Sequence, residues 1–379
     1  MADPVPFNRA AVAPRQLEYV EQSFASARLA GEGPFTERAR HALGAVLGTD
    51  QILLTPSCTA ALEMSALLAG VGPGDEVIVP SFTFVSTANA YLLMGAQPVF
   101  ADIDPVSMNI APDSVASLVT ERTRAIVPVH YGGRPCDMDA VQAIAQECGA
   151  SVIEDAAHGL YASLDGTPLG RLGRMSTFSF HETKNLSCGE GGALVVNDPE
   201  LWERACIIRE KGTDRTKFML GLTDKYTWVD VGSSYLLADT LAAIVLAQAE
   251  YATETQQRRR SAINAYMAEL AEWAKDNDVV LPAPTRAGDD PAYHMMPLLL
   301  ADAASRNRFL EHCRDHDVHS VFHYLPLHRS PMGERLGANP DSCPVTDDVS
   351  SRLARLPVFS DMQDWERDRV IEVVLSFRA

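Results

Sequence analysis

The chain has 379 residues, and its 50 acidic side chains outnumber its 32 lysines and arginines, for a formal charge of −18. Hydrophobic residues make up 46% and charged residues 22%, which is typical of a folded globular protein and excludes a disordered chain. The excess of acid argues against a nucleic-acid-binding surface, which needs clustered Lys and Arg. A small anionic ligand is not excluded, because a pocket can be locally cationic on an acidic protein.

Membrane and secretory signals are missing from the sequence. No apolar run reaches the roughly 18–20 residues that cross a bilayer, and the first residues lack a basic segment followed by an apolar one. Seven scattered cysteines without a CxxC pair favour reduced thiols over disulfides or a zinc ribbon. We therefore expect a cytoplasmic protein with neither nucleic acid nor a membrane as partner.

The predicted elements alternate along most of the chain. A first helix is predicted over residues 15–29, stopped by Gly31. Strands are then predicted at 51–55, 76–80, 98–103, 124–130, 151–155, 176–180 and 192–196, with helices at 60–69, 85–94, from Pro112, and from 137 to 148. This alternation predicts an α/β fold with a mostly parallel sheet flanked by helices.

The second part of the chain follows a different pattern. A long helical stretch over 238–270 leads into a Pro/Gly/Asp-rich loop with an edge strand over 277–294, and helices follow near 303–315 and 363–377. We expect a large domain over residues 1–250 and a smaller α+β domain over 251–379.

Lys184 gives the strongest local signal for chemistry. It follows an apolar strand within SFHETKNLSCGEGGAL, at the sheet edge where ligands of such folds bind. A lysine in a loop that excludes water has a lowered pKa and can form a Schiff base. The alternative is a solvated loop lysine.

Asp155 ends the strand SVIED, so its carboxylate is expected at the same edge. A pyridoxal phosphate site needs an acid there to keep the pyridine nitrogen protonated. The alternative is a helix N-cap. His158, three residues on, would contact the same cofactor or serve as an ordinary core or capping histidine.

The segment TPSCTAAL (55–62) turns from a strand into a helix. Amides at a helix start bind anions, so Thr59 and Ala60 are candidates to hold a phosphate; a Ser/Thr cap without a ligand is the alternative. Phe82 and Phe84 end the next strand, where one of them can stack on a planar ring. Together with Lys184 and Asp155, these groups predict pyridoxal 5'-phosphate. Neither GxGxxG after a strand nor GxxxxGK[ST] is present.

With these motifs, and with GEGPFTERARHAL, GEGGAL and FHYLPLH, nearly the whole chain resembles the DegT/DnrJ/EryC1/StrS sugar aminotransferases, pyridoxal-phosphate enzymes of fold type I. The variants SCTAAL, FHETKN and DKYTWVDVGSSYL resemble the branch that acts on dTDP-4-oxo-6-deoxy-D-glucose. The resemblance implies transfer of nitrogen from L-glutamate, with release of 2-oxoglutarate, to the C4 ketone of a dTDP-linked 4-keto-6-deoxyhexose. It also implies a homodimer with sites at the interface.

The resemblance also implies roles for individual residues. Lys184 matches the catalytic, cofactor-binding lysine and Asp155 the partner of the pyridine nitrogen. The remaining cofactor contacts would come from Cys58, Thr59, Ala60, Phe84, His158, Ser179 and Ser234, and the substrate contacts from His181, Glu190, Tyr324 and His328.

Two departures from the family pattern concern the phosphate. Cys58 stands where much of the family has Gly, and Gly232-Ser233-Ser234-Tyr235-Leu236 stands where much of the family has GxNxR. Ser234 is therefore the candidate to replace an Asn that reaches the neighbouring subunit's phosphate, and the sequence leaves this replacement open.

Several alternatives stay open at this stage. A 3-keto-sugar or cyclitol aminotransferase, a dehydratase and a non-catalytic regulator share the fold, but the dehydratases carry His where this chain has Lys184. Five histidines between 312 and 328 invite a metal site, yet no HExxH or paired cysteines accompany them, so no metal is predicted. The C4 configuration of the product, the nucleotide and the pathway are left open.

Overall fold

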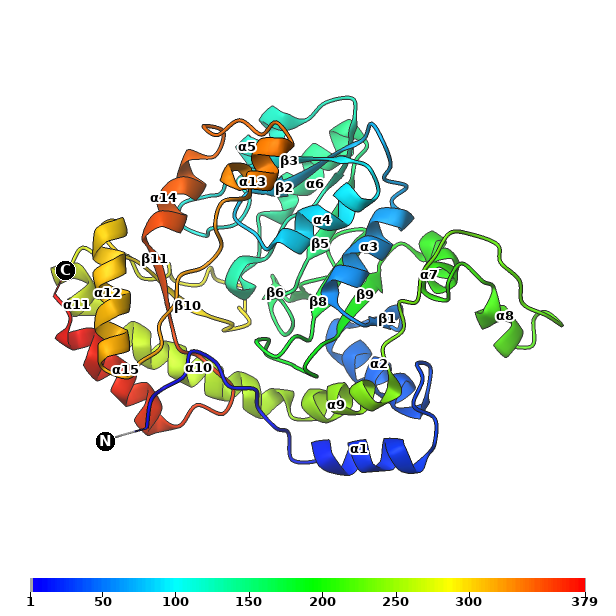
Figure 1. Cartoon of the computed structure of the whole chain (residues 1–379), viewed down its shortest axis with the longest axis horizontal. Coiled ribbons are helices and arrows are strands. Elements are labelled where there is room, and N and C mark those ends of the chain that lie inside the picture. The colour runs from blue at the N-terminus through cyan, green and yellow to red at the C-terminus, as the bar shows by residue number, and fades with distance from the viewer. Residues whose placement is uncertain (1–2, 379) are drawn as a thin grey trace.

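A seven-stranded sheet forms the centre of the computed structural model, which describes residues 3–378 (Figure 1). Its strands are β1 (Ile52–Thr55), β2 (Glu76–Pro80), β3 (Gln97–Ala101), β4 (Thr123–Ile126), β5 (Ser151–Asp155), β8 (Met175–Ser179) and β9 (Gly192–Val196). Their spatial order is β1-β9-β8-β5-β4-β2-β3. The predicted α/β fold with a mostly parallel sheet is confirmed.

Strand β9 is the exception to the parallel arrangement, because it runs antiparallel to both β1 and β8. The apolar run of β9 resembles the others, so the sequence did not reveal its direction. The consequence is geometric. β9 presents its amino end, where Gly191 and Gly192 lie, at the edge to which the other six strands bring their carboxyl ends.

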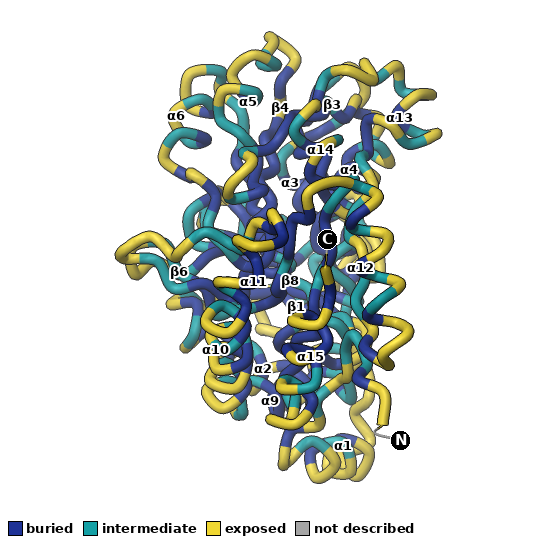
Figure 2. Tube along the Cα trace, turned by 90° about the vertical axis from the view of Figure 1, so that its left-hand side faces the viewer, coloured by how far each residue is buried: buried dark blue, intermediate teal, exposed yellow. Residues whose placement is uncertain are grey.

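Helices cover both faces of this sheet. They are α1 (Gln16–Ala25), α2 (Pro34–Leu47), α3 (Cys58–Leu68), α4 (Val85–Leu93), α5 (Pro112–Leu118), α6 (Met138–Cys148), α7 (Trp202–Arg209), α8 (Arg215–Met219) and α9 (Asp239–Glu250). Alternate side chains of β9 show the two layers: Leu194 packs with α3 and α7, whereas Val195 packs with α2 and α9. Helices α5 and α6 cover the other half of that second face. Figure 2 shows the strands as the buried interior.

The C-terminal part has its own core. It contains α10 (Ala252–Glu269), α11 (Ala271–Asp276), β10 (Met296–Leu299), α12 (Ala303–Asp315), α13 (Pro331–Arg335), α14 (Pro344–Arg352), β11 (Leu353–Leu356) and α15 (Asp364–Ser376). β10 and β11 pair antiparallel, and a short hairpin joins β6 (Ser163–Leu164) to β7 (Thr167–Pro168) in the first part. α9 ends at Glu250 and α10 starts at Ala252, so a break between helices lies at the division that we propose near residue 250.

Several element boundaries differ from the predicted ones. α3 begins at Cys58 because the Ser57 side chain accepts a bond from the Ala60 N–H and caps the helix. The stretch 238–270 is two helices that break at Tyr251. The predicted edge strand over 277–294 is reduced to isolated bridges at Val280 and Asp290. α2 was missed, although Pro34 at its start and the left-handed Gly48 at its end are standard signals.

Candidate active site

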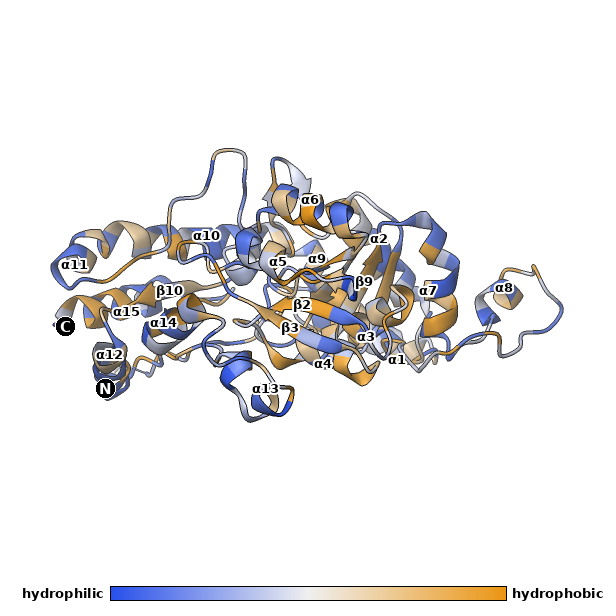
Figure 3. Ribbon diagram, turned by 90° about the horizontal axis from the view of Figure 1, so that it is seen from above, coloured by the Kyte–Doolittle hydropathy of each residue, from blue (hydrophilic) through white to orange (hydrophobic). Residues whose placement is uncertain are grey.

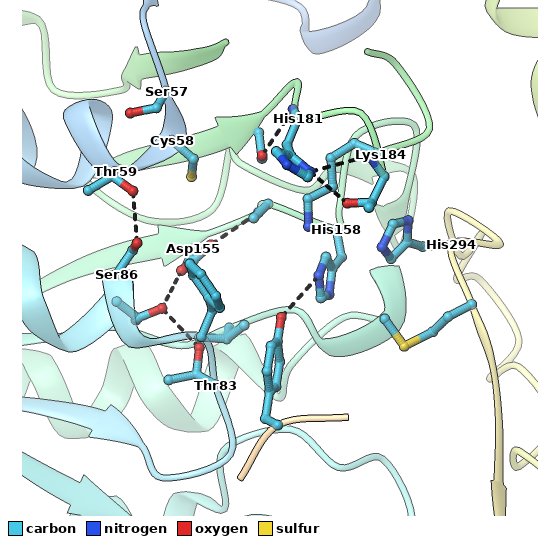
Figure 4. Close-up of a pocket in the computed structure, with 18 of the residues that line it drawn as sticks. Ser57, Cys58, Thr59, Thr83, Ser86, Asp155, His158, His181, Lys184 and His294 are labelled. Carbon is cyan, nitrogen blue, oxygen red and sulfur yellow. Dashed lines mark hydrogen bonds between the residues drawn. The ribbon is translucent and has the colours of Figure 1, made fainter. Parts of the chain in front are cut away.

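A cavity of about 530 Å³ opens at the carboxyl edge of the sheet. Its wall combines the start of α3, the end of β5, the loop after β8 and residues of the C-terminal part. Figure 4 shows Asp155, Lys184 and His158 around one space, with Ser57, Cys58 and Thr59 at one end of it. This is the location that the parallel sheet predicts for a ligand.

Asp155 is buried at the end of β5, and its carboxylate is held by two hydrogen bonds. Thr87 Oγ1 donates to Oδ2 over 2.8 Å, and the Ala157 N–H donates to Oδ1 over 3.1 Å. Since the Thr87 proton is used in this bond, Thr83 donates its own hydroxyl to Thr87 over 2.9 Å. Burial raises the pKa of Asp155, while the bond from Thr87 opposes the rise. A buried carboxylate of this kind needs a cationic partner.

Lys184 lies in the loop after β8, with its amine inside the cavity (Figure 4). Burial lowers its pKa from 10.5 to about 8, against the opposite effect of Cys58 and Asp155. A substantial fraction of this lysine is therefore neutral near pH 8. A neutral amine is the nucleophile that attacks a carbonyl.

The start of α3 forms an anion cradle opposite these groups. The Ser57 side chain caps the helix, and Thr59 Oγ1 donates to Ser86 Oγ over 2.8 Å. Gly192 permits the approach of β9, because a Cβ there would lie 2.5 Å from the Ser57 carbonyl carbon and the Cys58 nitrogen. Free N–H groups in the first turn of a helix bind phosphate.

The remaining wall consists of stacked rings. His158 stacks on His294 with centroids 4.4 Å apart, and His323 stacks on Tyr324 at 3.6 Å. Tyr324 and His158 are joined by a 3.3 Å hydrogen bond between the hydroxyl and Nε2. Burial holds the pKa of all three imidazoles well below 6.5, so this wall is neutral at physiological pH.

Most of the predicted site residues lie together. The cavity is lined by Cys58, Thr59, Phe84, Asp155, His158, Ser179, His181, Lys184, Glu190 and Tyr324. Phe84 lies at the mouth with 57% of its surface exposed, whereas Phe82 is buried against Tyr131 and Tyr324. His181 and Glu190 face each other, with 3.8 Å between Nε2 and Oε1.

Three predicted residues are not placed as the sequence suggested. The Ala60 N–H is already bonded to Ser57 Oγ, so it is not a free phosphate donor. His328 is fully buried beside the cavity, where its Nδ1 bonds to Ser81 Oγ over 2.6 Å, because its loop packs onto the end of β2. Ser234 is exposed and does not line the cavity, and its backbone forms an isolated bridge with Glu210.

Sequence reasoning missed several polar residues that line the cavity, among them Ser86, Thr87, His294, His323 and Arg355. Ser86 and Thr87 follow Phe84 and Val85 in FTFVST, so their place at the start of α4 was a usable signal. His294 and Arg355 come from loop and strand segments distant in the sequence, and no local pattern marks them.

Residues 11–375 match the DegT/DnrJ/EryC1/StrS aminotransferase family. The chain belongs to this family. It is 32% identical over 378 residues to the spore coat polysaccharide biosynthesis protein SpsC of Bacillus subtilis, covering 98% of this chain and 96% of SpsC. It is also 35% identical over 343 residues to the pleiotropic regulatory protein of Geobacillus stearothermophilus, covering 90% of this chain and 86% of that protein.

Solved structures of similar proteins share the whole fold. The aminotransferase TlmJ from Streptoalloteichus hindustanus superposes with a TM-score of 0.89 at 31% identity, covering 99% of this chain and 98% of TlmJ. DesV from S. venezuelae gives a TM-score of 0.88 at 28% identity, covering 99% of this chain and 98% of DesV. The expected family, and with it the pyridoxal phosphate cofactor, is confirmed.

The residues of the cavity fit this cofactor. His158 Nδ1 is buried without a hydrogen-bond partner among residues 3–378, which marks a polar wall that a ligand completes. The helix start suits a phosphate, Asp155 suits a protonated ring nitrogen, and Lys184 suits an aldehyde.

Among residues 3–378, no group of His, Cys, Asp and Glu is arranged to hold a metal ion. No described helix is both long and apolar enough to span a bilayer.

Proposed function

We propose that this aminotransferase moves the amino group of L-glutamate to the C4 ketone of a nucleotide-linked 4-keto-6-deoxyhexose, dTDP-4-keto-6-deoxy-D-glucose. The observation that carries the aminotransfer is the joint burial of the Lys184 amine and the Asp155 carboxylate in one cavity. The acceptor rests on the sequence variants SCTAAL, FHETKN and DKYTWVDVGSSYL. SpsC, whose name places it in polysaccharide biosynthesis, supports a sugar acceptor.

When bound, pyridoxal phosphate supplies an electron sink that stabilises negative charge at the carbon bearing the nitrogen. Asp155 holds the proton on the ring nitrogen, which keeps this sink effective. Thr59 and the amides at the start of α3 hold the phosphate. Lys184 would hold the cofactor through its amine, and the same amine is placed to move a proton at the donor Cα. The lowered pKa of Lys184 suits that role near neutral pH.

The neutral ring wall supports a sugar as the acceptor. His158, His323 and Tyr324 offer nitrogen and hydroxyl groups that can both donate and accept hydrogen bonds. Because burial lowers the pKa of both imidazoles, they stay uncharged beside the sugar. Such groups match sugar hydroxyls, and they avoid placing extra charge beside the reacting carbon.

The proposed homodimer is supported by an arm that projects from the large part of the protein. Figure 3 shows α8 and the loop beyond it standing away from the other elements. The arm exposes large apolar side chains, with Met219 at 65%, Leu222 at 72% and Trp228 at 78%. Exposed apolar surface of this size marks a protein interface. Ser234, at the base of this arm, is proposed to reach the phosphate bound by the partner.

The test follows amino transfer and product configuration. The holoenzyme is incubated with L-glutamate and dTDP-4-keto-6-deoxyglucose, and the C4 configuration of the product is read from proton coupling constants. Lys184→Ala is expected to abolish transfer, whereas Lys275→Ala, which removes an exposed lysine paired with Glu272, is expected to leave it unchanged. Retained turnover in Lys184→Ala would refute the assignment.

A second comparison separates this function from its alternatives. Keto-cyclitol and 3-keto-sugar acceptors are offered under the same conditions, and reaction with these alone would replace the proposed acceptor. A protein that acts only as a regulator would show no reaction with glutamate at all.

A further inference from the structure

Arg355 is a cation in the cavity that the cofactor does not require. It lies on β11, in the C-terminal part, and lines the same cavity as Lys184 and Asp155. Its Nε and Nη2 both donate to the Phe322 carbonyl oxygen, over 3.3 and 2.9 Å. Its guanidinium carbon lies 4.7 Å from the centre of the Phe7 ring. These contacts fix the group on one side and leave the Nη1 edge available.

Among residues 3–378 no carboxylate pairs with Arg355, whose guanidinium donates to one backbone carbonyl, that of Phe322. The buried Arg259 also lacks an acidic partner, but it donates to the carbonyl oxygens of Tyr293, His294 and Val358. Burial lowers the pKa of Arg355. A partly buried guanidinium without a counter-ion is unfavourable unless a ligand supplies one. Its position therefore indicates that an anion enters the cavity.

The other charged side chains of the cavity either serve the cofactor or lie at the exposed rim. Lys184 and Asp155 serve the cofactor, and Glu190 lies at the exposed rim with 71% of its side chain accessible. The phosphate cradle at the start of α3 uses backbone amides and hydroxyls. Arg355 thus remains as the cation for a second anionic molecule, bound while the cofactor is in place.

We propose that Arg355 binds a carboxylate of the amino-acid donor, and of the 2-oxo acid that leaves, and so orients the donor for reaction beside Lys184. This inference rests on the proposed use of glutamate and concerns the donor half of the reaction. A guanidinium binds a carboxylate through two parallel N–H···O bonds, which fix orientation as well as affinity.

The donor fits this position better than the nucleotide does. The cavity of about 530 Å³ must contain the cofactor together with either the donor or the reacting sugar, so the diphosphate and base of a nucleotide sugar extend towards solvent. A guanidinium in the cavity wall is placed for a small anion that lies in the cavity beside the cofactor. A rim cation would suit the diphosphate.

The experiment separates the two halves of the reaction in the holoenzyme. Loss of the visible cofactor absorbance on adding L-glutamate reports the donor half alone, and addition of the keto sugar to the amino form of the cofactor reports the acceptor half. In Arg355→Gln, the glutamate concentration for half-maximal rate is expected to rise about 10–100-fold. The keto-sugar dependence is expected to change less than about twofold. Arg355→Lys is expected to fall between, because lysine keeps the charge without the bidentate geometry.

A binding measurement gives a readout that does not depend on turnover. Maleate, a dicarboxylate without an amine, is titrated into the holoenzyme by calorimetry, and Arg355→Gln is expected to bind it about 10–100-fold more weakly. An amine donor without a carboxylate, such as 1-phenylethylamine, is expected to react equally with both proteins. Arg352→Gln is the control, because Arg352 pairs with Asp348 over 2.9 Å outside the cavity.

Each outcome decides the proposal. An unchanged glutamate dependence in Arg355→Gln, with intact cofactor absorbance showing a folded protein, would overturn it. A weakened keto-sugar dependence with normal glutamate would assign Arg355 to the nucleotide phosphates and would overturn it as well. If glutamate reacts as expected but no keto sugar does, the proposed acceptor fails while the role of Arg355 stands.

Discussion

The hydroxyl of Thr87 controls the carboxylate on which the electron sink depends. It donates to Asp155 Oδ2 over 2.8 Å inside the protein and receives the Thr83 hydroxyl on its other side. Thr87→Val keeps the shape of the side chain and removes this donor. The carboxylate then loses one of its two hydrogen bonds, and the bond from the Ala157 N–H remains.

The magnitude follows from the type of bond. A hydrogen bond to a charged group contributes about 1.5–3 kcal/mol, and 1.36 kcal/mol corresponds to one pKa unit. The pKa of Asp155, already raised by burial, should rise by about a further 1–2 units. A more basic carboxylate takes a larger share of the proton on the ring nitrogen and weakens the sink. We expect kcat to fall about 10–100-fold.

The assay compares kcat with glutamate and the keto sugar in the native enzyme and in Thr87→Val. Thr346→Val is the matched control, because Thr346 Oγ1 donates to Asp102 Oδ1 over the same 2.8 Å in a buried site outside the cavity. Both variants should lose similar stability in urea, but only Thr87→Val should lose turnover. Equal kcat in the two variants would refute the reasoning.

Three further predictions concern the same cavity. In cofactor-free protein, the rate at which the protein binds added cofactor should rise about tenfold per pH unit and level off above about pH 8. The reason is that the lowered pKa of Lys184 makes its amine neutral there. A rate measured by stopped-flow absorbance that is constant from pH 6 to 8 would contradict this. Gly192→Ala should lower the free energy of unfolding in urea by about 1–3 kcal/mol and weaken cofactor binding. The reason is that the added Cβ would lie 2.5 Å from the backbone of Ser57 and Cys58. Unchanged stability would show that the start of β9 and the start of α3 separate freely. Tyr324→Phe removes the 3.3 Å bond to His158 Nε2 and should lower kcat/KM for the keto sugar about 2–10-fold, with glutamate kinetics as the internal comparison.

Local sequence patterns predicted the parts of the site that follow directly from strand ends. Asp155 ends a continuous apolar strand, and the loop with Lys184 follows another, so the parallel sheet brings both to one edge. The helix start at Ser57 was also readable, because a hydroxyl residue before a small-residue helix is a capping signal. Each of these inferences depends only on residues that are close in the sequence.

Other parts of the site depended on packing between distant segments. Nothing local distinguishes β9 from a parallel strand, yet its reversal places Gly192 against the start of α3. His328 was expected at the substrate, but its buried bond to Ser81 joins segments 247 residues apart. Ala60 shows a finer limit, since the Ser57 cap consumes its N–H.

The acidic composition argued against a nucleic-acid surface. The alternating pattern and its strand-end residues predicted the α/β class, the cofactor chemistry and the pair Lys184 and Asp155. The tertiary structure alone decided which further groups complete the cavity. Arg355 and His294 come from the C-terminal part, far along the chain from Lys184. Their roles arise from burial and from the charges around them, and both quantities exist only once distant segments have packed together.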